Sequence, residues 1–118
     1  MNENKLSPEA VVQDQLDAYN ARDIEAFLRT YAEDVQILEH PSGKLIMTGH
    51  AELREVYSEI FNSNPEMHCK IVNRTVFGKF VLDLEHLTGR VNREPFQALA
   101  MYEVEGNVIT RVWFLKEE

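Results

Sequence analysis

Apolar residues recur at helical spacing in three segments of the N-terminal half of the chain. The first segment predicts a helix over residues 7–20 that begins at Ser7-Pro8-Glu9. Serine is a favoured N-cap, proline fits the first helical position, and an acid suits the first turn. A second helix follows Asp23, which can cap it, and a third follows Gly49. The apolar stripes of the three helices are Val12, Leu16 and Tyr19; Ile24, Phe27, Leu28 and Tyr31; and Leu53, Val56, Tyr57, Ile60 and Phe61.

The spacing between apolar residues falls to about two between the second and third helices and throughout the C-terminal half. A β-rich segment over residues 35–38 ends at His40-Pro41, because the residue before a proline is disfavoured in the helical region. The Ser42-Gly43 turn then predicts a short return strand over residues 44–47. Longer strands are predicted over about 67–77, 79–88, 96–105 and 107–116. Helices followed by a meander predict a single α+β domain with an antiparallel sheet.

Two of these strands carry apolar residues on both faces. Residues 98–102 form an unbroken apolar run of five, and residues 112–115 form a run of four. A strand with one face in water would alternate apolar and polar residues instead. Because three helices cover only one face of the sheet, the other face needs a second cover. We expect another copy of the chain to supply it, so that the protein is a homodimer.

Composition and charge exclude several classes of partner. The 118 residues hold 12 Lys and Arg against 20 Asp and Glu, a net charge of −8, and the length fits one domain over residues 1–118 with a disordered tail at 1–6. An acidic chain without a basic cluster is not expected to bind nucleic acid or an anionic membrane. The polar N-terminus lacks the apolar core of a secretory signal, so we expect a cytoplasmic location.

Short motifs between the predicted elements carry a resemblance to a known family. They are N-A-x-D between the first two helices, Y-A-x-D before the first strand, and T-G before the third helix. The stretch AYNARDIEAFLRTYAEDVQILEHPSGKLIMTGHAELREVY, followed by YEVEGNVITRVWF, resembles the SnoaL-like branch of the nuclear transport factor 2-like superfamily. The resemblance implies a cone-shaped, curved antiparallel sheet wrapped on three helices, a cystatin-like α+β roll with an apolar pocket, usually as a dimer. The superfamily includes ketosteroid isomerases, polyketide cyclases, dehydratases, epoxide hydrolases and non-catalytic modules, so membership alone assigns no activity.

The resemblance implies a general base at the end of the first strand. Counting forward from Asp34 selects Glu39, whereas counting back from the following proline selects His40. Strand neighbours point to opposite faces, so only one of them can enter the pocket. Val35 and Ile37 share the parity of Glu39 and favour it; a carboxylate beside an apolar cavity has a raised pKa and suits proton transfer. The alternative is a polar pair that caps the hairpin.

Ketosteroid isomerases hold the substrate oxygen with a helix Tyr and a protonated strand Asp. The matching positions here are Gln15 and Ala100, and loss of one such donor typically costs ~10²-fold in rate, so steroid isomerisation by that mechanism is not expected. Tyrosines at other positions could contact a ligand oxygen, or could be core residues with wet tips. The ligand-binding candidates are Gln15, Tyr19, Tyr31, Tyr57, Ala100, Tyr102 and Phe114.

His86 is a further catalytic candidate. Leu82 and Leu84 alternate with acidic residues, so the period-two pattern predicts that His86 shares the apolar face that lines the cone. The resemblance to polyketide cyclases implies an aspartate partner fourteen residues later, but that position is Ala100. The alternative is a hydrogen-bonded core histidine.

The remaining reactive residues form no recognisable motif. His68 and Cys69 are adjacent on a predicted strand, so they face opposite ways and cannot pair, and Cys69 is expected to be a small buried residue. The four histidines lack metal-binding spacing, so neither a metal nor a cofactor is expected.

Three functions fit these observations. The first is a pocket protein that binds a small apolar, oxygen-bearing molecule, with isomerase- or lyase-like proton transfer. The second is a non-catalytic dimerisation or ligand-sensing module, and the third is a subunit that pairs with a different chain. A cone filled by bulky residues such as Phe27, Phe77, Phe80 and Phe114 would exclude the first.

Overall fold

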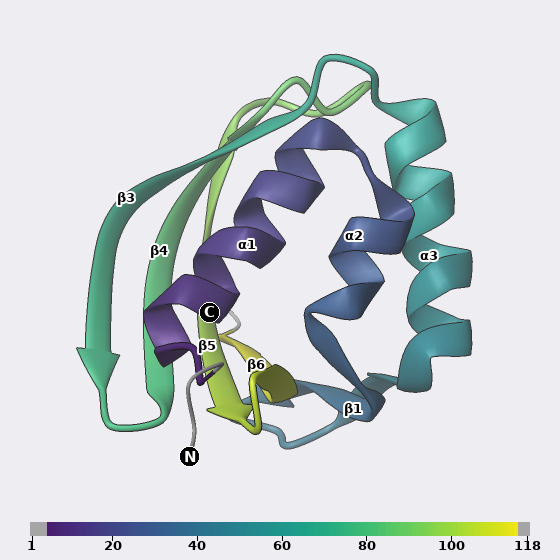
Figure 1. Ribbon diagram of the computed structural model, residues 1–118. Coiled ribbons are helices and arrows are strands. Elements are labelled where there is room, and N and C mark those ends of the chain that lie inside the picture. The colour runs from purple at the N-terminus through teal and green to yellow at the C-terminus, as the bar shows by residue number, and fades with distance from the viewer. Residues whose placement is uncertain (1–4, 116–118) are drawn as a thin grey trace.

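The computed structural model describes residues 5–115, which form three helices and six strands (Figure 1). The helices are α1 (Pro8–Ala21), α2 (Ile24–Arg29) and α3 (Gly49–Ser63). The strands are β1 (Tyr31–His40), β2 (Leu45–Thr48), β3 (His68–Phe77), β4 (Phe80–Thr88), β5 (Phe96–Glu105) and β6 (Val108–Leu115). Residues 1–4 of the predicted tail lie outside the described residues, whereas the Leu6 backbone N–H donates to Asn107 Oδ1 at 2.8 Å.

The α+β fold predicted from the sequence is confirmed, with one difference in the sheet. The strand order is β2-β1-β6-β5-β4-β3, and all neighbours are antiparallel except β1 and β6, which are parallel. The prediction of a wholly antiparallel sheet was therefore wrong at this junction. The chain crosses through α3 to the far edge and meanders back, so β6 joins β1 without a hairpin to set its direction.

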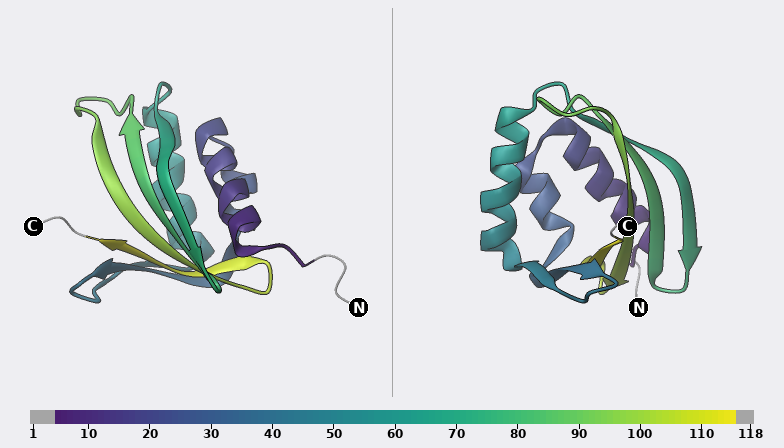
Figure 2. Two further views of the ribbon diagram at one scale, coloured as in Figure 1. Left: turned by 90° about the vertical axis from the view of Figure 1, so that its left-hand side faces the viewer. Right: turned by 180° about the vertical axis from the view of Figure 1, so that it is seen from behind.

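The sheet curves around the helices, as Figure 2 shows from two sides. The predicted caps form: Ser7 Oγ accepts the Ala10 N–H and Asp23 Oδ1 accepts the Ala26 N–H, each at 3.1 Å. The core between the helices and the inner sheet face includes Val12, Phe27, Leu53, Val81 and Ile109, all fully buried. Burial of this apolar surface is the main force that holds the helices in the curve of the sheet.

Tyr31 begins β1. The helical spacing had placed it on the second helix, and this prediction was wrong. The helix ends at Arg29, where Thr30 Oγ1 donates to the Phe27 carbonyl at 2.7 Å. The Thr30 carbonyl in turn accepts the Ile109 N–H at 2.8 Å. This bond to β6 draws the chain into the sheet, and Tyr31 points inward from a strand.

The outer face of the sheet is rich in apolar side chains. Phe77 is 78% exposed, and Leu82, Met101 and Trp113 are half-buried. The prediction that the C-terminal strands carry apolar residues on both faces is confirmed. Among the described residues, no helix has the length and apolar character needed to cross a membrane.

Candidate functional site

A cavity of about 220 Å³ lies between the inner face of the sheet and the helices. Its walls come from α1, α3 and five strands, and from the loop between β4 and β5. They consist of Gln15, Leu16, Tyr19, Tyr31, Tyr57, Ile60, Cys69, Glu85, Leu87, Arg90, Arg93, Phe96, Ala98, Tyr102 and Phe114.

A buried carboxyl group next to a phenol forms part of this wall. Glu85 of β4 is buried, and the Tyr102 hydroxyl donates to Glu85 Oε2 at 3.2 Å. Among the described residues, every side-chain oxygen or nitrogen that is fully shielded from solvent has a hydrogen-bond partner. Glu85 Oε1 makes no hydrogen bond within residues 5–115, so it is reachable from the cavity.

The environment of Glu85 favours its neutral form. Burial raises its pKa from 4.5 to about 7, and the nearby Asp83 charge adds to the rise. The Tyr102 hydrogen bond and the Arg74 charge oppose it. A carboxyl group with this pKa can both donate and accept a proton near neutral pH.

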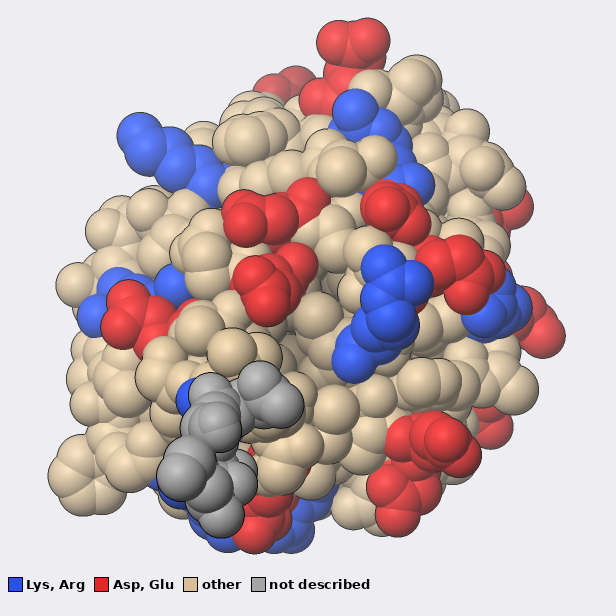
Figure 3. All heavy atoms as spheres, in the orientation of Figure 1, with Lys and Arg blue, Asp and Glu red and all other residues tan. Residues whose placement is uncertain are grey.

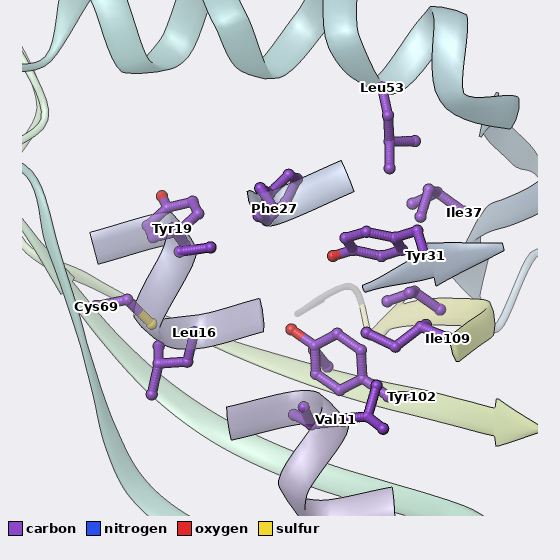
Figure 4. Packing of buried hydrophobic residues seen from close by; sticks show 14 of the residues in the cluster. Val11, Leu16, Tyr19, Phe27, Tyr31, Ile37, Leu53, Cys69, Tyr102 and Ile109 are labelled. Carbon is purple, nitrogen blue, oxygen red and sulfur yellow. The ribbon is translucent and has the colours of Figure 1, made fainter. Parts of the chain in front are cut away.

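Three further tyrosines surround the same space. Figure 4 shows Tyr31 and Tyr102 with their hydroxyls turned toward a common interior region, although they come from β1 and β5. Burial raises the pKa of Tyr31 well above its usual value and also raises that of Tyr57; the Glu85 charge adds to both. The phenols therefore stay protonated and can donate hydrogen bonds to a ligand oxygen.

A buried ion pair supports the strand that carries Glu85. Arg74 of β3 donates two hydrogen bonds to Asp83, from Nε to Oδ1 at 2.7 Å and from Nη2 to Oδ2 at 2.9 Å. The Arg74 Nη1 group also donates to Gln13 Oε1 of α1 at 2.9 Å. The buried Asp83 carboxylate therefore has its charge paired within the sheet. Glu85, the next inward-facing residue of β4, lines the cavity.

Two arginines of the β4–β5 loop complete the cavity wall. The Arg93 guanidinium stacks over the Phe96 ring, 3.5 Å from its centroid. The Arg90 guanidinium lies close enough to Tyr19 to offset part of the rise that burial causes in the pKa of that phenol. Two cationic side chains therefore line this end of the cavity.

The family of the chain follows from comparison with known proteins. Residues 12–112 match the model of the SnoaL-like domain. The chain belongs to the SnoaL-like domain family. No curated protein matches it.

Solved structures agree with this SnoaL-like fold. A cystatin-fold protein from Novosphingobium aromaticivorans is 25% identical, with a TM-score of 0.85 over 95% of this chain and 100% of that one. A candidate ketosteroid isomerase from Kribbella flavida is 22% identical, with a TM-score of 0.79 over 94% and 78% of the two chains. A candidate polyketide cyclase from Sinorhizobium meliloti is 18% identical, with a TM-score of 0.76 over 89% and 93%. The latter two likenesses concern the fold alone.

Most ligand-binding residues predicted from the sequence of this SnoaL-like domain do line the cavity. These are Gln15, Tyr19, Tyr31, Tyr57, Tyr102 and Phe114. Ala100 faces inward but belongs to the packed core, opposite Asp83. Their contact with a ligand stays a prediction.

The two residues at the end of β1 are separated from the cavity wall. Glu39 pairs with Phe114 on the inner face and is half-buried, and the Ser42 hydroxyl donates to its Oε1 at 2.8 Å. His40 is exposed and precedes a cis peptide bond to Pro41. The parity argument for Glu39 is therefore correct, but neither residue is part of the wall.

The prediction that His86 faces the pocket was wrong. On β4 the buried residues are Val81, Asp83, Glu85 and Leu87, so His86 lies on the outer face with the leucines. Apolar residues occupy both faces of this strand, and alternation alone does not say which one is covered. Because the sequence prediction took the face of His86 as the inner one, it did not include Glu85 as a site residue.

A signal in the sequence could have found the correct face. The two-residue turn at Gly78-Lys79 sets the hairpin register, which places Arg74 opposite Asp83. An arginine and an aspartate paired across strands identify a common face. Glu85 lies two residues along the strand and shares it.

The aromatic residues that could have filled the cone leave it open. Phe27 belongs to the core, but Phe77 is exposed, Phe80 lies on the outer face against Trp113, and Phe114 forms part of the wall. His68 and Cys69 do face opposite ways, since only Cys69 is buried. Burial raises the pKa of this thiol to about 12, so it stays protonated.

Proposed function

We propose that this SnoaL-like domain binds a small one-ring molecule with a ketone or similar oxygen group, and that Glu85 exchanges a proton with it. The observation that carries the proposal is the Glu85–Tyr102 pair, which has one carboxyl oxygen open to an otherwise largely apolar cavity. Fold relatives described as candidate isomerases and cyclases are consistent with proton transfer at this place.

The cavity volume limits the size of the ligand. A dry cavity of about 150 Å³ can hold benzene, whereas sites for drug-sized ligands usually exceed about 300 Å³. The value of about 220 Å³ fits one ring with one or two substituents. Four fused rings would require the cone to open further.

The chemistry follows from the two kinds of oxygen in the wall. The ionised Glu85 carboxylate removes a proton from the carbon next to a ketone, and the electron pair of the broken C–H bond moves to the ketone oxygen. The Tyr57 hydroxyl, which donates to no acceptor among the described residues, supplies a hydrogen bond to that oxygen. Return of the proton from Glu85 to carbon completes the exchange, with no other reactant needed.

Hydrogen–deuterium exchange tests this proposal. Acetophenone, a one-ring ketone, is incubated with the protein in D₂O, and loss of its methyl proton signal is followed by NMR. We expect Glu85→Gln to slow the exchange at least about hundredfold, since a positioned base typically contributes 10²–10⁴-fold. Glu55→Gln, an exposed site on α3, is the matched control and should leave the rate unchanged.

The outcomes separate the candidate functions. Binding of acetophenone without accelerated exchange contradicts the proton transfer and favours a ligand-sensing module. Exchange that persists in Glu85→Gln but is lost in Glu39→Gln would return the role of base to the strand end of β1. No binding at all contradicts the proposal as a whole.

We also propose that the domain forms a homodimer through its outer sheet face. The apolar residues there include Leu82, Met101 and Trp113. Charges beside them balance within one chain, because Glu103 is bonded to Arg111 at 2.9 Å and lies 3.4 Å from Lys79 Nζ. Two copies with a net charge of −8 each can meet on this locally neutral surface. Light scattering after size exclusion should give twice the chain mass; a monomer would contradict the pairing.

A further inference from the structure

We propose that the natural ligand carries a carboxylate on the opposite side of its ring, and that Arg90 binds this group at the cavity mouth. The inference rests on the proposed function, because it concerns the same cavity. It identifies the ligand as a para-substituted ring acid with a ketone or related oxygen group at its inner end. Three features of the described residues support it.

The first feature is that the arginines at the mouth lack acidic partners. Arg90 is half-buried and Arg93 is exposed, and both line the cavity. Within residues 5–115, neither guanidinium lies within 4.0 Å of a carboxylate, although Arg54, Arg74 and Arg111 all do. Arg22 and Arg29 also lack a carboxylate within this distance, but neither of them lines this cavity.

Carboxylates are abundant in this chain, which has 20 Asp and Glu residues. Figure 3 shows acidic side chains spread over the helical face of the molecule, with basic ones between them. The Arg90 guanidinium nevertheless lies near the Tyr19 phenol of the cavity wall, and no described carboxylate is within 4.0 Å of it. A guanidinium in this position offers its N–H groups to an anion, and a carboxylate matches their geometry in pairs.

The second feature is that the backbone around Arg90 is held in place from both sides. Asn64 at the end of α3 accepts the Val91 N–H with Oδ1 and donates to the Ile60 carbonyl with Nδ2, each at 2.8 Å. Gly89 has a φ of +76° and packs so closely that an added Cβ would lie 2.0 Å from the Glu66 carbonyl oxygen. Figure 1 shows the two loops side by side at one end of the molecule. The backbone that carries Arg90 is therefore fixed before any ligand arrives, which lowers the entropy cost of binding.

The third feature is the order of groups along the cavity wall. Glu85 pairs with Ala98 across β4 and β5, and the next inward-facing pair, Leu87 and Phe96, lies between them and the loop that carries the arginines. A strand rises about 3.3 Å per residue, so about 10 Å separate Glu85 from the end of β4 at Thr88. This is about the length of a ring with substituents at opposite ends. Polar, apolar and cationic groups thus follow one another in the order that such an acid presents.

Isothermal titration calorimetry with two matched probes tests the inference. The probes are 4-acetylbenzoate and 4-acetylbenzamide, which have the same shape but differ in charge. We expect the wild-type protein to bind the carboxylate at least about tenfold more tightly, because hydrogen bonds to charged groups are stronger than those between neutral groups. Raising the salt concentration should weaken binding of the carboxylate more than that of the amide.

Variants then assign the preference to one residue. Arg90→Gln should reduce the carboxylate preference to less than about twofold while the amide affinity changes little. Arg29→Gln, an exposed site on α2, is the matched control and should keep the full preference. A preference that is lost only in Arg93→Gln would overturn the assignment to Arg90.

The results also distinguish this inference from the proposed function. Equal binding of the two probes by the wild-type protein overturns the carboxylate inference, while exchange of acetophenone protons can still support the role of Glu85. Failure to bind either probe, together with absence of acetophenone exchange, overturns both. The wild-type comparison needs no variant, so a folding defect in Arg90→Gln does not prevent the decision.

Discussion

Replacement of Glu85 by glutamine should remove a pH-dependent cost from the stability of the folded protein. The amide has the size of the carboxyl group and can still accept a hydrogen bond from the Tyr102 hydroxyl, but it cannot ionise. The wild-type side chain is 7% exposed, so its ionised form is poorly hydrated. The variant therefore isolates the effect of one buried charge.

The magnitude follows from the pKa of this carboxyl. Burial first, and the Asp83 charge second, raise it from 4.5 to about 7. At about 1.4 kcal/mol per pH unit, this difference corresponds to about 3 kcal/mol of unfolding free energy. Below pH 4.5 the group is neutral in both the folded and the unfolded chain, and it imposes no cost.

The pH dependence of the stability has the opposite sign to that caused by a salt-bridged acid. Between pH 4.5 and about 7 the unfolded chain releases the proton while the folded protein keeps it, so the stability of the wild-type protein falls as the pH rises. Above about pH 7 the folded protein carries the full cost. The glutamine variant should therefore gain about 3 kcal/mol relative to wild type between about pH 4 and about pH 8.5.

Urea unfolding at fixed protein concentration measures this gain. The single tryptophan, Trp113, gives a fluorescence signal, and circular dichroism provides an independent one. The difference between the variant and wild-type free energies cancels the other titrating groups, and Glu55→Gln is the control. A difference that stays within about 0.5 kcal/mol over the whole pH range would refute a buried carboxyl with a raised pKa.

Three other substitutions test the surrounding structure. Gly89→Ala should cost at least about 3 kcal/mol because its Cβ meets a backbone carbonyl, whereas Gly43→Ala, which has a similar positive φ in open space, should cost about 1 kcal/mol; equal costs in urea unfolding contradict the clash. Arg74→Met should cost about 3–5 kcal/mol, since it leaves the Asp83 carboxylate buried alone; a loss below about 1 kcal/mol contradicts this. Leu82→Asp should turn the dimer into a folded monomer, and light scattering that still finds a dimer rejects the outer sheet face as the interface.

Local sequence determined the helices, their beginnings and the meander. The Ser7 and Asp23 caps form because a side-chain oxygen three residues away satisfies a backbone N–H, and no distant residue takes part. The hairpin between β3 and β4 is equally local, because its two-residue turn sets the register. Together with the family motifs, these signals were enough to predict the fold and six of the fifteen residues of the cavity wall.

Tertiary structure alone decided which face of β4 is covered, where the second helix ends, and how β6 meets β1. Each of these depends on a partner distant in the chain: α1 and Arg74 for the acidic face of β4, Ile109 for the strand that begins at Tyr31, and the whole meander for the parallel junction. The alternation of residues defines the two faces of a strand but does not say which one is buried; packing against the rest of the chain decides that. That selection placed Glu85 in the cavity and His86 outside it.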